Sequence, residues 1–347
     1  MADKRGTSDR AEPVRVGVVG MGIRGQMYAT AAVGLGGAEL VGVCDLSEDR
    51  RRAAAEQFSV PGFADTEAMC RQAGPEAVVV ATPDFAHVEP ALTAAGAGAH
   101  LLIEKPLAMD LADGRRVTEA VAAAGVRAMV AFENHWNPPV SAMKAAAEAG
   151  ELGELVSCNS QLDDRIDVPT EMLTWLGRSS PGWFLMSHTV ELAGWIAGQK
   201  PRRVWAAGRK GVLTARGIDT YDAIHAVIEF DGGMTGSFSS CWVLPRSIPL
   251  VFQFRHEMVG TAGSARADLT DQMLHLAGER YEHPSTIGVS MTGALTSPPA
   301  QMFADFLSAL RGGGEMPCPL AEALVNVAAV AAIHESIETG RAVDVRV

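Results

Sequence analysis

Short apolar runs alternate with segments of helical spacing over the first third of the chain. The runs are apolar at consecutive positions, which is typical of strands buried on both faces of a parallel sheet. We expect strands at residues 14–20, 39–45, 77–83, 100–104 and 126–134, with helices at 20–33, 47–58, 87–96 and 109–125. Strict alternation of strand and helix predicts an α/β fold with a doubly wound parallel sheet.

The pattern changes after Asn134. A helix is expected at 139–150, followed by runs that alternate apolar and polar residues, at 155–162, 202–209, 223–230, 234–242 and 251–260. FDGGM, residues 230–234, fits a hairpin turn. The runs predict an antiparallel sheet with one face free, on which Phe238 and Trp242 either form a dimer surface or pack against the domain's own helices.

Composition excludes several classes of protein. The chain has 347 residues, more than one core normally takes, and a net charge of −12 without a basic run, which argues against nucleic-acid binding. We expect neither a signal peptide in the charged opening segment nor a membrane span. Five scattered cysteines fit neither a disulfide framework nor a metal site, and favour a cytoplasmic location.

A G-x-G-x-x-G pattern leaves the first strand and opens the first helix. In this context the glycines allow a tight turn, close approach of a pyrophosphate and close packing of helix on strand. Amide groups at the helix start then face the phosphates, and Arg24 adds a charge. The predicted dinucleotide-binding turn consists of Gly20, Met21, Gly22, Ile23, Arg24 and Gly25.

Asp45 ends the second strand. A carboxylate at this position accepts hydrogen bonds from the adenosine ribose and repels a 2′-phosphate, which favours NAD over NADP. Arg50, Arg51 and Arg52 follow, and one of them reaching a 2′-phosphate is the alternative to a solvated helix face.

Two more strand ends carry residues suited to a site. Thr82 and Pro83 end one strand, and Glu104 and Lys105 end the next, before Pro106. Ligands of open parallel sheets bind beyond the carboxyl ends of strands, so we expect Lys105 at the nicotinamide end of the crevice. Pro106 makes the preceding bond a candidate cis peptide.

These segments resemble the Gfo/Idh/MocA oxidoreductases. The matching stretches are VGVVGMGIRG, VVVATPDFAH, LLIEKPLAMD, ENHWNPPVSAMKAAAEAGELGEL, HTVELAGWIAG, IEFDGGMTGSFSSCW and FADFLSALRGG. The resemblance implies a Rossmann domain and a carboxyl-terminal α/β domain whose open, mostly antiparallel sheet mediates contacts in a homodimer or homotetramer. We therefore expect a flexible tail at 1–12, a dinucleotide-binding domain at 13–134 and a substrate-binding and oligomerisation domain at 135–347.

The resemblance also assigns roles to side chains. Lys105 is implied in substrate binding and proton transfer, and His188 aligns with the histidine of the family's D-x-G-x-H-x-x-D pattern, with Glu191 at the last acidic position. Phe184 and Met186 replace the first Asp and the Gly of that pattern. Either another acid substitutes (Asp163, Asp164 or Glu191), or the substrate differs, or the reaction is impaired.

Several further residues are candidates for the cleft. Asn134 and Trp136 leave the last parallel strand and are either substrate contacts or hinge residues. Asp164 and Arg165, expected in an irregular segment, are either substrate contacts or part of a surface turn. His87 matches the family's ATPxxxH stretch, and lies near the nicotinamide or opens a helix.

The predicted reaction is hydride transfer between a nicotinamide cofactor and a secondary hydroxyl of a sugar, sugar derivative or cyclitol. Asp45 favours NAD over NADP as that cofactor. His188 would accept the hydroxyl proton, and Lys105 would polarise the oxygen. Two alternatives stay open: an enzyme that keeps and recycles tightly bound NAD, as redox-assisted glycosidases and aldose oxidoreductases of the family do, and a non-catalytic dinucleotide-binding sensor.

Overall fold

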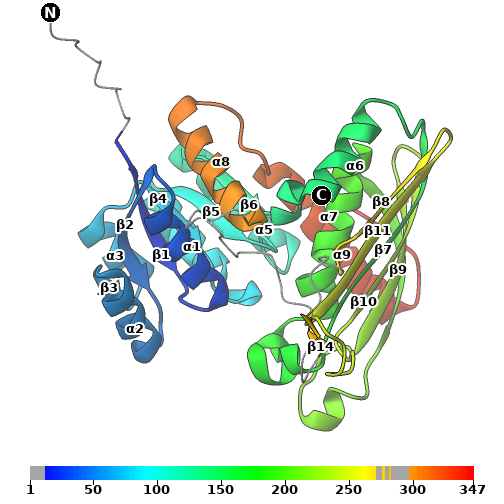
Figure 1. Ribbon diagram of the computed structural model, residues 1–347, viewed down its shortest axis with the longest axis horizontal. Coiled ribbons are helices and arrows are strands. Elements are labelled where there is room, and N and C mark those ends of the chain that lie inside the picture. The colour runs from blue at the N-terminus through cyan, green and yellow to red at the C-terminus, as the bar shows by residue number, and fades with distance from the viewer. Residues whose placement is uncertain (1–11, 271–275, 278–280, 283–296) are drawn as a thin grey trace, which may run out of the picture.

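Two large sheets, each with its own hydrophobic core, organise the described part of the chain (Figure 1). The computed structural model describes residues 12–270, 276–277, 281–282 and 297–347. All of the predicted flexible tail except Glu12 lies outside these residues, so the prediction of a tail stays a prediction.

The first sheet is parallel and has the strand order β3-β2-β1-β4-β5-β6. Its strands are β1 (Val14–Val19), β2 (Ala38–Cys44), β3 (Gly62–Phe63), β4 (Ala77–Val80), β5 (His100–Glu104) and β6 (Ala128–Ala131). Its helices are α1 (Ile23–Gly34), α2 (Glu48–Phe58), α3 (Thr66–Ala73), α4 (Val88–Gly96) and α5 (Leu111–Ala124). The chain reverses its direction of winding between β1 and β4, so a crevice opens beyond their carboxyl ends. The predicted doubly wound Rossmann sheet is confirmed.

The second sheet has the order β12-β11-β7-β10-β9-β8-β15. Its strands are β7 (Leu155–Asp164), β8 (Pro201–Arg209), β9 (Ala223–Phe230), β10 (Thr235–Cys241), β11 (Phe252–Gly260), β12 (Ser264–Asp268) and β15 (Val343–Asp344). Only β7 and β10 pair in parallel, so the sheet is mostly antiparallel, as expected. The predicted turn at 230–234 joins β9 to β10. A separate pair consists of β13 (Leu276–Ala277) and β14 (Tyr281–Glu282).

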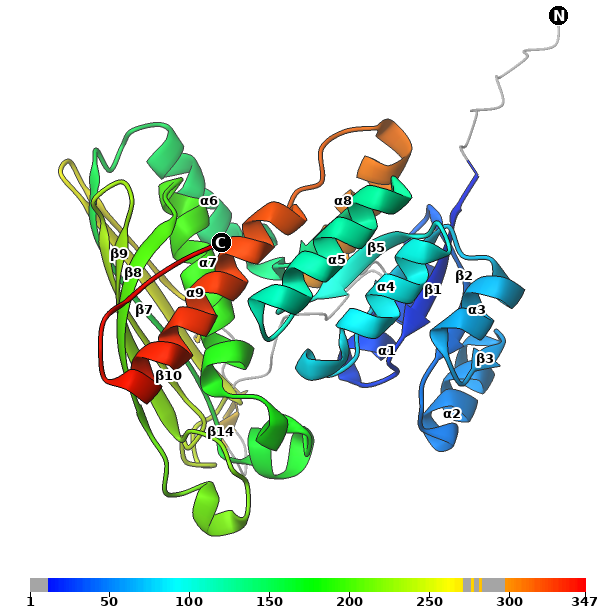
Figure 2. The same ribbon diagram turned by 180° about the vertical axis from the view of Figure 1, so that it is seen from behind.

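Helices cover the inner face of the second sheet. They are α6 (Pro138–Glu148), α7 (Ser187–Ala197) and α9 (Leu320–Thr339), and Figure 2 shows α9 crossing between the two halves. Phe238 and Trp242 are fully buried on this inner face, so the proposal that they form an exposed dimer surface is wrong. They pack against the domain's own helical layer, because their strand positions point inward.

Short helical turns connect several of these elements. They are η1 (Asp84–Ala86), η2 (Glu133–Trp136), η3 (Val168–Met172), η4 (Leu176–Arg178), η5 (Gly182–Met186) and η6 (Thr214–Arg216). Of these, η3 and η5 are π-helical, and η5 runs directly into α7. Wide turns of this kind often occur at functional sites.

The chain returns to the first sheet near its end. Helix α8 (Pro298–Gly312) buries Phe303 and Phe306 in the amino-terminal core, where Phe303 contacts Tyr28 of α1. Sequence patterns did not indicate this return. The expected boundary at residue 134 is the point where the chain first passes from the first sheet to the second. The carboxyl-terminal helices then contribute to both hydrophobic cores.

Helix α9 is, among the described residues, long and apolar enough to cross a membrane by length and composition. The expectation of no membrane span stays a prediction for this 20-residue helix, because a buried core helix meets the same criteria of length and composition. It packs against β8, α5 and α7, and its buried residues belong to both cores. These contacts are those of a core helix.

Candidate active site

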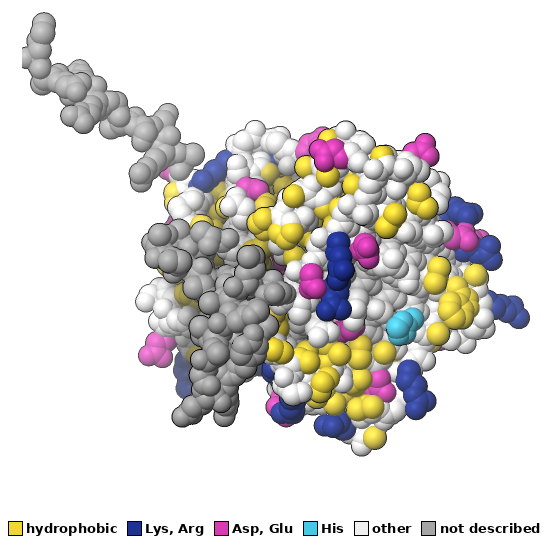
Figure 3. Space-filling view, turned by 45° about the vertical axis from the view of Figure 1, so that its right-hand side comes forward, with side chains coloured by type: hydrophobic (Ala, Val, Ile, Leu, Met, Phe, Trp, Pro, Cys, Tyr) yellow, Lys and Arg dark blue, Asp and Glu magenta, His cyan; other side chains and the backbone are white. Residues whose placement is uncertain are grey.

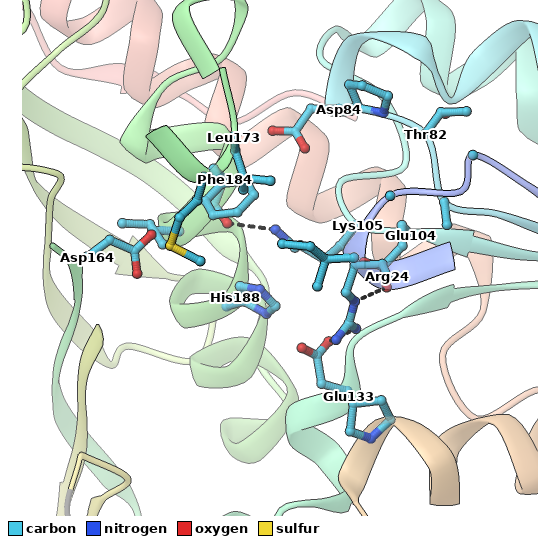
Figure 4. Close-up of a pocket in the computed structure, with 18 of the residues that line it drawn as sticks. Arg24, Thr82, Asp84, Glu104, Lys105, Glu133, Asp164, Leu173, Phe184 and His188 are labelled. Atoms are coloured by element: carbon cyan, nitrogen blue, oxygen red, sulfur yellow. Dashed lines mark hydrogen bonds and ion pairs between the residues drawn. The ribbon is translucent and has the colours of Figure 1, made fainter. Parts of the chain in front are cut away.

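A cavity of about 690 Å³ lies between the carboxyl edge of the first sheet and the inner side of the second. Its lining combines the glycine turn, the ends of β2, β4 and β5, and residues from β7, η5 and α7. Figure 4 shows side chains from both halves pointing into it. A volume of this size is within the range of small-molecule sites.

The glycine turn has the geometry that a bound dinucleotide requires. Gly20 has φ +89°, and a Cβ there would lie 2.6 Å from the carbonyl oxygen of Ala81. A Cβ at Gly25 would lie 1.7 Å from the carbonyl oxygen of Gly20, whereas Gly22 faces open space. No side chain caps the start of α1, so its first amide groups are available to a phosphate. These features fit a pyrophosphate.

Asp45, at the end of β2, is hydrogen-bonded to the glycine turn. Its carboxylate accepts from the backbone amides of Met21 (2.8 Å) and Ser47 (2.7 Å). Arg50 donates two further hydrogen bonds of 3.1 Å each. Burial alone would raise the pKa of Asp45, but the hydrogen bonds from Arg50 and the two amides outweigh it and lower the pKa. Asp45 is thus an anionic acceptor where a ribose hydroxyl would bind.

Arg24 lines the cavity but faces carboxylates. Its Nε donates to Glu104 at 2.6 Å, and its Nη2 lies 3.3 Å from Glu133. Tyr28 also donates to Glu104, at 2.8 Å. The guanidinium charge is therefore balanced within the protein. The predicted contact of Arg24 with a phosphate would require this ion pair to open, and it stays a prediction.

Lys105 extends from the end of β5 toward the second half of the chain. The Lys105–Pro106 bond is cis, as the sequence suggested. The ammonium donates to the carbonyl oxygen of Phe184 at 2.8 Å and lies 4.1 Å from the centroid of its ring (Figure 4). An ammonium has three hydrogens, so donors remain for a ligand oxygen.

His188 lies in the first turn of α7 and faces the same space. Its Nδ1 is 3.3 Å from the amide nitrogen of Asn134, which the sequence also placed at the cleft. Burial, followed by the Lys105 ammonium, lowers the pKa of His188 well below its ordinary value. The imidazole is therefore neutral near neutral pH and can accept a proton.

Asp164 is the candidate acid that the fold brings to the cavity. The expectation of an irregular segment is wrong here, because β7 continues through Asp164 and pairs it with Phe252 of β11. Burial raises the pKa of Asp164 to about 7, against the effect of the Lys105 ammonium. Asp163 and Glu191, the other two candidate acids, do not line the cavity.

Four other expected site residues make contacts within the protein instead. Glu191 accepts from Nε2 of His135 at 2.8 Å, and the indole of Trp136 donates to Asp305 at 2.6 Å. Arg165 makes a two-pronged pair with Asp167. His87 lies between the carbonyl oxygens of Pro106 (2.6 Å) and Thr82 (2.9 Å) and connects two strand ends. None of the four lines the cavity, whereas Thr82 and Pro83 do.

Asp84 is a cavity residue that no sequence pattern had assigned to the site. This residue follows the strand end at Thr82-Pro83, lines the cavity, and accepts from the hydroxyl of Ser179 at 2.6 Å. Burial raises its pKa, although Lys105 and His87 oppose the shift. Its position directly after the strand end at Thr82-Pro83 could have identified it as a site residue from the sequence.

Comparison with known proteins identifies the family. A protein-family model described as 'Oxidoreductase family, NAD-binding Rossmann fold' matches residues 14–132. A second family model, the GFO/IDH/MocA C-terminal domain, matches residues 140–266. A Bacillus subtilis scyllo-inositol 2-dehydrogenase (NAD(+)) is 28% identical over 258 residues, 72% of each chain. A Rhizobium meliloti inositol 2-dehydrogenase is 24% identical over 96% of this chain and 99% of its own.

Solved structures share the fold. That of a Lactobacillus casei scyllo-inositol dehydrogenase with bound NAD(H) and scyllo-inositol has a TM-score of 0.83 at 18% identity, covering 96% of this chain and 99% of the other. The predictions of an NAD cofactor and of a dehydrogenase are confirmed at the level of the family. The chain belongs to the Gfo/Idh/MocA oxidoreductases, and its amino-terminal half is an NAD-binding Rossmann domain.

Proposed function

We propose that the protein transfers a hydride between nicotinamide and a secondary hydroxyl of a sugar, sugar derivative or cyclitol. The observation that carries this proposal is the convergence of Lys105, His188 and Asp164 in one cavity whose other end is the glycine turn. The inositol dehydrogenases among the relatives support the same class of substrate.

The side chains have complementary tasks in the direction of oxidation. Bound NAD would supply the hydride acceptor for the hydrogen on the carbinol carbon. Lys105, fixed by the Phe184 carbonyl, donates to the carbinol oxygen and stabilises charge that develops on it. His188, held neutral, accepts the hydroxyl proton as the carbonyl forms. Asp164 binds a neighbouring hydroxyl.

Asn134 would set the hydrogen position on His188. The two orientations of its amide group have the same shape, and the hydrogen-bond network decides between them. When the amide oxygen faces Nδ1, that nitrogen carries the hydrogen and Nε2 is free to accept a proton. We therefore assign Asn134 a positioning role, based on its 3.3 Å contact with Nδ1.

A panel of inositols, hexoses and glycosides tests the proposal by reduction of added NAD, with NADP in parallel. Lys105→Met is expected to lower kcat by about 10²–10⁴-fold, the usual contribution of a proton-transfer or charge-stabilising group. Lys210→Met is the matched control, because Lys210 pairs with Asp219 at the surface. Near-normal turnover by Lys105→Met would contradict the assignment.

The replacement of the family acid by Phe184 keeps two other functions as candidates. NADH that co-purifies and survives desalting would favour an enzyme that recycles tightly bound cofactor. Intact NADH binding without turnover of any polyol or glycoside would favour a sensor. A cytoplasmic location remains a prediction from the five scattered cysteines.

We further propose that the outer face of the second sheet joins copies of this chain into a homodimer or homotetramer. Trp205 and Val227 are directly paired across β8 and β9 and are 49% and 48% exposed. Figure 3 shows apolar side chains on this open face. Light scattering of Trp205→Glu should show a smaller species than the native protein, and an unchanged mass would contradict the proposal.

A further inference from the structure

The cavity has an aromatic side. Phe85, Trp175, Phe184 and Trp242 contact one another in sequence, with ring centroids 6.1, 5.9 and 5.9 Å apart and tilted or edge-to-face planes. We call these four residues the aromatic wall. Trp175 and Phe184 line the cavity itself. Edge-to-face arrays of this kind are favourable arrangements for aromatic rings.

Other apolar side chains continue this surface. Met172 ends η3, Leu173 follows it, and Phe252 begins β11; all three line the cavity and none is fully buried. On the second-domain side the described lining residues with polar side chains are Asn137, Asp164, Thr174 and His188, and the indole of Trp175 carries one N–H donor. The remaining second-domain lining is apolar, whereas the first-domain side carries most of the polar groups, among them Lys105, Asp84 and Glu104.

This division does not suit a free cyclitol. Such a ring carries a hydroxyl on every carbon, and a hydroxyl buried without a hydrogen-bond partner is unfavourable. Several hydroxyls would face Trp175, Leu173 or Phe252. Phe184, at a position where the family pattern has an acid, also disfavours a cyclitol. Its side chain offers no hydrogen-bonding group and adds apolar surface next to Lys105.

We propose that the substrate is a glycoside with an aromatic aglycone. This inference rests on the proposed function and names its substrate class. The sugar ring lies at the polar end, with the reacting hydroxyl between Lys105 and His188 and another hydroxyl at Asp164. The aglycone packs against Trp175, Leu173 and Phe252. An aromatic group is favoured over an alkyl chain because the wall presents ring edges and faces.

Calorimetric binding to the enzyme–NADH complex tests the proposal without requiring turnover. The ligands are methyl, hexyl and phenyl glucosides, as matched anomers, and myo-inositol. Phenyl glucoside is expected to bind about tenfold more tightly than methyl glucoside, or about 1.4 kcal/mol, because the phenyl ring buries apolar surface and a well-placed aromatic contact adds to that burial. Equal affinity for the two, or tighter binding of myo-inositol, would overturn it. Equal affinity for hexyl and phenyl glucosides would overturn the aromatic assignment.

Variants locate the contact. Trp175→Ala should abolish the preference for phenyl over methyl glucoside, and Trp175→Phe should keep most of it, both with unchanged NADH affinity. Val212→Ala, at a half-exposed apolar residue outside the cavity, is the control. A preference that survives Trp175→Ala would contradict the proposal.

Turnover then separates the two proposals. Oxidation of inositol without aryl preference would overturn this inference and leave the proposed function standing. Preferential binding of phenyl glucoside without hydride transfer would make the aryl glycoside a ligand of the cavity and not a substrate, and would contradict the proposed function.

Discussion

The two ends of the cavity are built in different ways. The cofactor end is backbone: two glycines whose Cβ atoms would collide with carbonyl oxygens, and an uncapped helix start. The substrate end consists of side chains from β5, β7, η5 and α7, which are far apart in sequence. Backbone geometry leaves little freedom for substitution, whereas a wall of side chains can change its chemistry without altering the fold.

The largest expected effect is at the backbone end. Gly25→Val should weaken NADH binding by at least about 1,000-fold, or about 4 kcal/mol, because the added side chain starts 1.7 Å from the Gly20 carbonyl oxygen and must displace the turn. Fluorescence titration with NADH measures this. Gly36→Val, where a Cβ meets nothing within 4 Å, is the matched control. Unchanged NADH affinity in Gly25→Val would show that the turn does not hold the cofactor.

An intermediate effect is expected at the substrate end. Because burial raises the pKa of Asp164 to about 7, the folded protein keeps this proton at pH values where the unfolded chain has lost it. The folded state binds more protons in that window, so this group lowers stability as pH rises from about 4 to 7. Asp164→Asn removes the effect. The variant should gain about 2–3 kcal/mol relative to the native protein between pH 5 and pH 8.

Urea unfolding at the two pH values measures this difference. Asp219→Asn, at an exposed carboxylate, serves as the control and should show the same change in stability at both. A pH-independent effect of Asp164→Asn would mean that the carboxyl is ionised throughout the range.

The smallest effect concerns the adenosine end. Arg50 is exposed and forms an ion pair with Asp45. Its removal takes away a positive charge close to where a 2′-phosphate would bind. Arg50→Ala should weaken NADPH binding by up to about fivefold, as for exposed ion pairs, and leave NADH affinity nearly unchanged. Arg52→Ala, on the same helix, is the control. A loss of NADH affinity instead would assign Arg50 to the NAD site.

The same contrast explains what the sequence could predict. The parallel sheet, the glycine turn, Asp45 and Lys105 are local features, because periodicity and strand ends determine them. Asp164 and Glu191 looked equivalent as replacement acids, and only packing separated them: β7 continues through Asp164, while Glu191 faces His135. The return of α8 to the first core and the aromatic wall depend on contacts between distant segments, which no local pattern encodes.

The central claim is that a dinucleotide lies across the glycine turn with its nicotinamide beside Lys105 and His188. The most direct test is a crystal structure of the protein with NADH and a glycoside. We expect the reacting hydroxyl within hydrogen-bond distance of both side chains, and the nicotinamide ring against the same carbon. A nicotinamide bound elsewhere, with Lys105 and His188 contacting neither ligand, would contradict the account.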